Sequence, residues 1–360
     1  MSLLLPSRSL LGLAALTLTL HACTRGDRPA GKDSSPAGGA GGELVYVTNE
    51  DSRDLTVIDA GTDSVITMIP VGTRPRGVSV SSDGRTVYVA LSGSPKCPPT
   101  MPDEECEKLV ADKSQDGIAL VDVATGQTVR VLPGGSDPEE FDVSPDGTRL
   151  FVSNEDVDSA SILDLKTGKL IANVKVGDEP EGVTLSPDGK TFWVTGETAH
   201  DITGVDAVTG KVVASINVVK ERPRSIGFLP DGSRAYVTAE VGGTVAVVDI
   251  PGRKTVKQIP MPEGSRPMGI AVSTDGKRIY VSNGRGKTVS VIDTATDSVV
   301  ASVEVGTRPW GIALTADGRK LYTANGPGND VTVVDTETMT VVKRIPSGGL
   351  PWGVAIGPKP

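Results

Sequence analysis

The sequence predicts an all-β fold, a seven-bladed β-propeller built from four-stranded antiparallel blades. Three observations predict it: a repeat with a period of about 42 residues, a four-strand pattern within each repeat, and terminal fragments that together make one more repeat. A fixed period of this size indicates a repeat architecture, and four strands per 40–45 residues is typical of a propeller blade. The repeat is marked by Asp-Gly pairs, whose glycines are Gly84, Gly147, Gly189, Gly232, Gly276 and Gly318.

Residues 263–306 show one repeat in full. The predicted strands are 268–273, 278–283, 288–293 and 298–305. The first run (MGIAVS) is apolar, and Gly276 in the turn after it can take the positive φ that a short hairpin needs. The second (RIYVSN) is rich in aromatic and β-branched residues, and the last two alternate as half-buried strands do.

The two ends of the chain predict how the ring closes. Residues 43–49 form a second strand with no first strand before it, and residues 351–358 form a first strand with nothing after it. Added to six internal repeats, the two fragments complete a seventh, so we expect the C-terminal strand to close the first blade. The 63 residues between Gly84 and Gly147 are one period plus an insertion, residues 92–116, in the second blade.

Four short motifs identify a family resemblance. They are Tyr46-Val47-Thr48-Asn49, Pro-x-Gly at 75–77, Ser-Pro-Asp-Gly at 186–189 and Val-Ile-Asp-x-x-Thr at 291–296. Over residues 43–360 the chain resembles the YVTN-repeat family of seven-bladed β-propellers. The resemblance implies the fold but not the function, because propellers serve as enzymes, ligand binders and scaffolds.

The N-terminus predicts a lipoprotein signal peptide over residues 1–22. Its apolar stretch, residues 10–20, is too short to span a bilayer. It ends in Leu-His-Ala-Cys, which resembles the bacterial lipobox and implies that Cys23 receives the lipid. His21 departs from the usual lipobox, and an ordinary secretory signal cleaved nearby is the alternative. Thr24, in place of Asp, resembles the signal for sorting to the outer membrane.

Residues 23–42 predict a flexible tether, because they are rich in Gly, Ala, Ser and Pro. Such a chain reaches roughly 25 Å, which holds the propeller near a membrane that it contacts only through the lipid anchor. We therefore expect a monomer in the cell envelope, attached to the outer membrane and facing the periplasm or the cell surface.

Composition excludes several classes of partner and cofactor. Removing residues 1–22 removes only Arg8, so the net charge goes from −9 to −10, which argues against a nucleic acid partner. The only histidines are His21 and His200, so a histidine-rich metal centre is excluded, and we expect no cofactor. Cys97 and Cys106, both in the insertion, predict a disulfide in an oxidising compartment, with free thiols or a metal site as the alternative.

The variable position of the repeated Pro-x-Gly motif provides the candidate binding residues. This motif opens the strand nearest the axis, and its Pro recurs in all seven copies, whereas Glu140 and Ser225 replace the Gly in two. An aromatic wall facing a charged wall is typical of a ligand pocket. The residues at x are Arg76, Glu139, Glu181, Arg224, Met268, Trp310 and Trp352.

Two further rings of acids follow from the repeat. Glutamates end the second strand in four blades, where they bind a cation or a basic partner or else pair with nearby arginines; they are Glu50, Glu155, Glu197 and Glu240, and the arginines are Arg74, Arg222, Arg266 and Arg308. Aspartates end the third strand in all seven blades, which indicates a structural role in the following turn. These are Asp59, Asp122, Asp164, Asp206, Asp249, Asp293 and Asp335.

Taken together, the sequence favours a non-catalytic, lipid-anchored propeller that binds a protein or a small ligand at its axial face. The alternative is a lactonase-like propeller hydrolase that uses axial carboxylates such as Glu139 and Glu181, with or without Ca²⁺. His200 lies in a loop with no nucleophile motif, so we interpret it as an ordinary surface residue.

Lipidation at Cys23 is directly testable. Cells that express the protein are expected to incorporate a radiolabelled fatty acid into it, and Cys23→Ser should abolish the label because the acceptor thiol is gone. Cys97→Ser serves as the matched control and should keep the label. An unlabelled protein with Cys23 intact would contradict the prediction.

Overall fold

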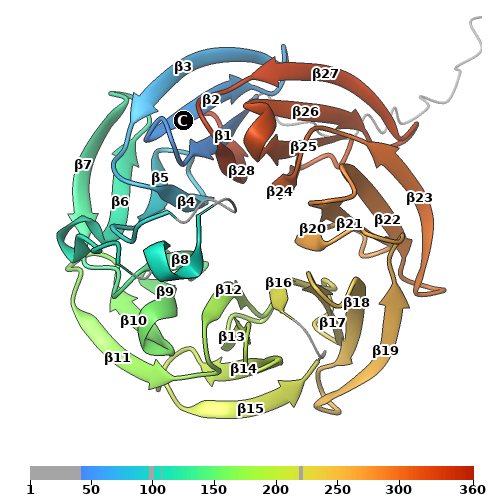
Figure 1. The fold of residues 1–360 in the computed structure, drawn as a ribbon, viewed down its shortest axis with the longest axis horizontal. Coiled ribbons are helices and arrows are strands. Elements are labelled where there is room, and N and C mark those ends of the chain that lie inside the picture. Colours follow the sequence, from blue (N-terminus) through green and yellow to red (C-terminus); the bar gives the residue numbers. More distant parts are fainter. Residues whose placement is uncertain (1–41, 97–100, 107, 219–221) are drawn as a thin grey trace, which may run out of the picture. The chain divides into compact units, whose positions relative to one another are not determined.

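The computed structural model describes residues 42–96, 101–106, 108–218 and 222–360. In this part of the chain, seven four-stranded antiparallel sheets follow one another around a central axis (Figure 1). The predicted seven-bladed β-propeller is therefore confirmed. The predicted signal peptide, Cys23 and all of the predicted tether except Gly42 lie outside the described residues.

The four strands of each blade are named from the axis outward. Blade A is β28 (Pro351–Pro358), β1 (Glu43–Asn49), β2 (Asp54–Asp59) and β3 (Ser64–Pro70). Blade B is β4 (Pro75–Val80), β5 (Thr86–Leu91), β6 (Gly117–Asp122) and β7 (Gln127–Leu132). Blade C is β8 (Pro138–Val143), β9 (Arg149–Asn154), β10 (Ser159–Asp164) and β11 (Leu170–Lys175). Blade D is β12 (Pro180–Leu185), β13 (Thr191–Gly196), β14 (Asp201–Asp206) and β15 (Val212–Asn217).

The remaining blades follow the same order. Blade E is β16 (Pro223–Phe228), β17 (Arg234–Ala239), β18 (Thr244–Asp249) and β19 (Lys254–Pro260). Blade F is β20 (Pro267–Val272), β21 (Arg278–Asn283), β22 (Thr288–Asp293) and β23 (Ser298–Glu304). Blade G is β24 (Pro309–Leu314), β25 (Lys320–Asn325), β26 (Asp330–Asp335) and β27 (Thr340–Pro346). The short helical turns are α1 (Asp103–Cys106), η1 (Lys113–Gln115), η2 (Glu155–Val157) and η3 (Gly326–Gly328).

Blade A is closed by the C-terminal strand, as predicted. β28 pairs antiparallel with β1, with Val45 opposite Ile356 and Val47 opposite Val354. In Figure 1 the red C-terminal strand lies beside the blue N-terminal strand. In blade F, the predicted first strand is displaced by one residue, because Ser273 belongs to the turn, where its hydroxyl donates to Asp275 at 2.8 Å. None of the helices in the described ranges is long and apolar enough to cross a membrane.

The aspartates that end the third strands have the structural role expected of them. In every blade the side chain accepts a hydrogen bond from a backbone N–H of the next turn; for example, Asp293 accepts from Thr296 at 2.9 Å. The glycines of the six Asp-Gly turns likewise adopt φ between 67° and 71°. The seven aspartates and the six turn glycines therefore both stabilise turns.

A recurring link between neighbouring blades is a buried hydroxyl on the second strand. In blade A, Thr48 donates to the carbonyl of Arg76 in blade B at 2.6 Å and accepts from the N–H of Gly353 in its own blade at 2.9 Å. Blades C, D, E and F repeat this arrangement with Ser153, Thr195, Thr238 and Ser282. The hydroxyl therefore joins its own first strand to the x residue of the next blade.

The glycine of the Pro-x-Gly motif is required by the same close approach. A Cβ at Gly182 would lie 2.2 Å from the carbonyl oxygen of Arg224, and one at Gly311 would lie 2.5 Å from that of Trp352. Real Cβ atoms do not approach a backbone oxygen so closely. The glycine of the motif is therefore needed because the innermost strands of neighbouring blades pack closely around the axis.

Removing one of these hydroxyls should destabilise the ring. Thr238→Val keeps the shape of the side chain but leaves the N–H of Ser225 and the carbonyl of Met268 without their buried partner. We expect the free energy of unfolding to fall by about 1–3 kcal/mol, measured by urea denaturation. Thr323→Val is the matched control: Thr323 is equally buried but bonds only Asn325 in its own blade, so it should cost less. Equal losses in the two variants would contradict the inter-blade role.

Candidate functional site

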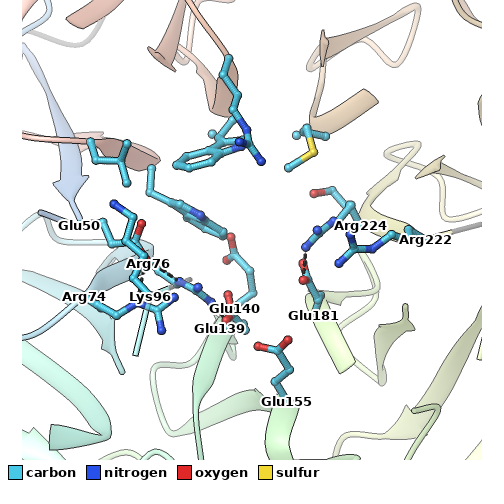
Figure 2. Close-up of a pocket in the computed structure, with 18 of the residues that line it drawn as sticks. Glu50, Arg74, Arg76, Lys96, Glu139, Glu140, Glu155, Glu181, Arg222 and Arg224 are labelled. Atoms are coloured by element: carbon cyan, nitrogen blue, oxygen red, sulfur yellow. Dashed lines mark hydrogen bonds and ion pairs between the residues drawn. The ribbon is translucent and has the colours of Figure 1, made fainter. Parts of the chain in front are cut away.

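A cavity of about 580 Å³ opens at one end of the axis, and we call it the mouth. The structure places all seven predicted x residues on its wall: Arg76, Glu139, Glu181, Arg224, Met268, Trp310 and Trp352. Figure 2 shows the charged members of this wall converging on one opening. The cavity is within the size range of small-ligand sites.

The chain turns into each innermost strand with an unusual backbone conformation. The residue before each Pro has φ between 42° and 55°, although none of the seven is glycine. Positive φ is uncommon for such residues and often marks functional positions. Sequence reasoning missed this conformation, although the recurring Pro marked its place. The seven are Arg74, Asp137, Glu179, Arg222, Arg266, Arg308 and Leu350.

On one side of the mouth, Arg76 joins two blades. Its Nε lies 3.3 Å from Oε1 of Glu50, and its Nη1 pairs with Glu139. Arg74 contacts the same Glu50 oxygen through Nε at 2.9 Å. Glu50 and Glu139 are 5% and 1% exposed. Removing Arg76 would leave the buried charge of Glu139 uncompensated, whereas Glu50 would keep its contact with Arg74.

On the opposite side, Arg224 is shared by three carboxylates. It pairs with Glu181 through Nη1, contacts Oε2 of Glu197 at 3.4 Å and holds Oε2 of Glu240 through Nη2 at 2.9 Å. Arg222 also pairs with Glu197. Three of the four predicted ring glutamates, Glu50 included, therefore follow the alternative in which they pair with nearby arginines.

Glu155, the fourth ring glutamate, behaves differently. Within the described residues it forms no ion pair, and its carboxylate lies near those of Asp137 and Glu139, with all three ligand atoms within 4.8 Å of one another. Burial, followed by the charges of Glu181 and Asp137, raises the pKa of Glu155 to about 8. A cation could bind these three carboxylates only in competition with Arg76, which already holds Glu139.

Glu140 was not predicted as a site residue, although its replacement of the motif glycine was visible. It lines both the mouth and a smaller axial cavity beneath it. Burial among the innermost strands, followed by the charges of Glu181 and Asp142, raises the pKa of Glu140 to about 8. Departure from the repeat was the signal that could have identified it.

The aromatic wall consists of Trp310 and Trp352, from adjacent blades. Their ring centroids are 6.3 Å apart and the rings are tilted by 49°. Arginine side chains lie over both: Arg308 is 5.1 Å from the centroid of Trp310, and Arg76 is 6.0 Å from that of Trp352. Both indoles therefore have faces that accept a cation.

The insertion of blade B reaches the edge of the mouth. Lys96 lines the cavity and pairs with Asp51 at 2.6 Å. Asp116 anchors the insertion, since its carboxylate accepts from the N–H of Gly93 at 2.7 Å and of Asp137 at 3.0 Å. Cys97 lies outside the described residues, so the Cys97–Cys106 disulfide stays a prediction.

A family model for YNCE-like β-propellers matches residues 109–229 and 188–319, more than half of the chain. The chain belongs to the YNCE-like β-propeller family. A search of curated proteins finds no match to it.

Solved structures with the same fold resemble this YNCE-like propeller at low sequence identity. Hydrazine synthase of Kuenenia stuttgartiensis is 22% identical over 81% of this chain and 92% of its own, with a TM-score of 0.70. A protein of unknown function from Desulfotomaculum acetoxidans is 17% identical over 88% and 99%, with a TM-score of 0.71. A Bacteroides uniformis protein, provisionally assigned as a 6-phosphogluconolactonase, is 18% identical over 87% and 99%, with a TM-score of 0.69. These likenesses show the fold alone.

The raised pKa of Glu155 predicts how stability varies with pH. Because the folded protein holds this proton more tightly than the unfolded chain, its contribution is complete below the ordinary glutamate pKa and is lost as pH rises toward about 8. Glu155→Gln removes the titrating group, so its thermal midpoint should fall less between pH 5 and pH 8, roughly the interval between the two pKa values.

The control for this experiment is Glu304→Gln, which removes an exposed glutamate of β23. It should keep the pH dependence of the unchanged protein. Parallel midpoint curves for the unchanged protein and Glu155→Gln would show that Glu155 does not titrate in this range.

Proposed function

We propose that the protein is a non-catalytic, lipid-anchored propeller of the cell envelope that binds a protein or small-molecule ligand in the mouth. One observation carries the binding proposal: the seven x residues, the variable positions of an otherwise regular motif, line a single cavity of about 580 Å³. The regular positions, such as the bridging hydroxyls and the turn aspartates, have structural roles. Positions that vary around the ring are free to serve a ligand.

The chemistry of the wall supports the same proposal. Trp310, Trp352 and Met268 present apolar surface, whereas Arg76, Arg224 and their carboxylates present fixed charges. Ion pairs orient these charges before a ligand arrives, and preorganisation reduces the cost of binding. Lipid anchoring and the outer-membrane location are proposed on the Leu-His-Ala-Cys sequence and on the residues that follow it.

The geometry gives less support to the hydrolase alternative. Glu139 pairs with Arg76 and Glu181 pairs with Arg224. A general base or a Ca²⁺ ligand at either position would have to break an ion pair that is largely buried. A ligand that binds beside these pairs needs no such step.

The tryptophan pair is expected to be necessary for binding. Trp310→Ala and Trp352→Ala should each reduce recovery of the partner when the protein is used to capture ligands from its native envelope, because each removes part of the apolar wall. Bound material would be measured by mass spectrometry. Trp193→Phe is the matched control, since Trp193 is buried within blade D and does not line the mouth.

Two results would contradict the proposal. Unchanged capture by both mouth variants would mean that the tryptophans only pack against each other. Turnover of lactone or ester substrates, with or without Ca²⁺, that disappears in Glu139→Gln or Glu181→Gln would identify the protein as an enzyme.

A further inference from the structure

The ion pairs of the mouth follow a rule that one pair of blades breaks. The arginine before the Pro of one blade pairs with the glutamate that ends the second strand of the preceding blade. Arg74 contacts Glu50 at 2.9 Å, Arg222 pairs with Glu197, and Arg266 lies 3.9 Å from Glu240. At these three junctions between blades, the residue before the Pro therefore provides the counter-ion of the glutamate in the preceding blade.

Between blades C and D the counter-ion is missing. The rule pairs Glu155 of blade C with the residue before Pro180 of blade D, and that residue is Glu179. A carboxylate thus occupies the place where the three paired junctions provide a guanidinium, and it adds to the charge that raises the pKa of Glu155.

A second carboxylate without an arginine faces the same opening. Glu140 replaces the motif glycine of β8, and the described part of the chain offers it no ion pair. Of the five acids that line the mouth, the other three each contact an arginine. Figure 2 shows Glu140, Glu155 and Glu181 in the same part of the opening, with the carboxylate of Glu181 directed to Arg224. The two carboxyl groups without an arginine, Glu140 and Glu155, therefore line the same part of the mouth, where the charge of Glu181 acts on both.

The other part of the wall is apolar and suited to a cation. Trp310 and Trp352 already have guanidinium groups 5.1 and 6.0 Å from their ring centroids, and Met268 and Leu350 extend the apolar surface. Indole is the best of the aromatic rings at attracting a cation, and carboxylates with an aromatic wall form a recurring receptor for organic cations.

We infer that the ligand of the mouth is an organic cation, an amine or guanidinium attached to an apolar body. Its charged group lies between Glu140 and Glu155, where it replaces the missing arginine, and its apolar body lies against Trp310 and Trp352. This inference rests on the proposed ligand-binding function and specifies the ligand's chemistry. Charge and shape select it together, since a cation replaces the protons that Glu140 and Glu155 otherwise hold at neutral pH, whereas a neutral ligand offers these carboxyl groups no counter-ion.

The test uses three probes that share a phenyl ring and differ in charge: benzylamine, benzyl alcohol and benzoate. Titration calorimetry on the purified protein should show benzylamine binding at least about tenfold more tightly than the other two. Glu140→Gln and Glu155→Gln should each weaken benzylamine by about tenfold or more, since each removes one of the charges that hold the amine. A short peptide with one internal arginine, run beside benzylamine, distinguishes a protein side chain from a free amine.

A further variant supplies the missing cation within the chain. Glu179→Arg supplies the arginine that the three paired junctions have, so it should pair with Glu155 and abolish benzylamine binding. Glu337→Arg is the matched control: it makes the same charge change in the exposed turn between β26 and β27, on the opposite rim, and should leave binding unchanged.

The outcomes separate the inference from the function on which it rests. Equal or tighter binding of benzyl alcohol or benzoate, lost in the tryptophan variants, would overturn the cation and keep a ligand-binding mouth. Benzylamine binding that survives Glu179→Arg would also overturn it. If no probe binds, the inference fails, and the proposed function then depends on envelope capture with the tryptophan variants alone.

Discussion

A buried hydroxyl between neighbouring blades is the interaction on which the rest of the structure depends. In five blades a Ser or Thr of the second strand fixes the N–H of its own first strand and the carbonyl of the next blade's x residue. Because the backbone of the x residue is held from its carbonyl side, its side chain has a defined direction toward the axis. The contacts that hold neighbouring blades together therefore also position the residues of the mouth.

This constraint explains why the mouth can vary while the ring does not. The Pro, the Gly and the hydroxyl use only backbone atoms of the neighbouring blade, so they place no demand on the side chain at x. Arg76, Met268 and Trp310 can occupy equivalent positions with the same inter-blade geometry. Ion pairs such as those of Arg224 then join adjacent blades a second time through side chains.

Much of the fold could be predicted from the sequence because each copy of the repeat shows the same strand pattern. The strands of β1, β21 and β22 agree with the predicted ranges residue for residue, and the closure by β28 follows from two incomplete repeats. The members of the mouth were likewise predictable from one variable position. The pairing of the ring glutamates with the arginines before the Pro was predicted as one of two alternatives. The ion pairs of Arg76 with Glu139 and of Arg224 with Glu181 were not predictable, because they join residues of different blades and depend on how far those blades approach. Glu140 shows the limit of prediction from sequence: its replacement of the motif glycine was visible, but its burial beside Glu181 and Asp142 was not.

The asymmetry of the mouth follows from the same reasoning. Asp137 and Glu179 stand where four other blades have arginine, and Glu140 stands where five have glycine. Each substitution places a carboxyl group in a partly buried ring. Burial, followed by the neighbouring negative charges, raises the pKa of Glu140 and Glu155 and costs folding stability at neutral pH. Local rules that are broken at a cost to stability, all in the adjacent blades C and D, are expected where a site serves binding rather than folding.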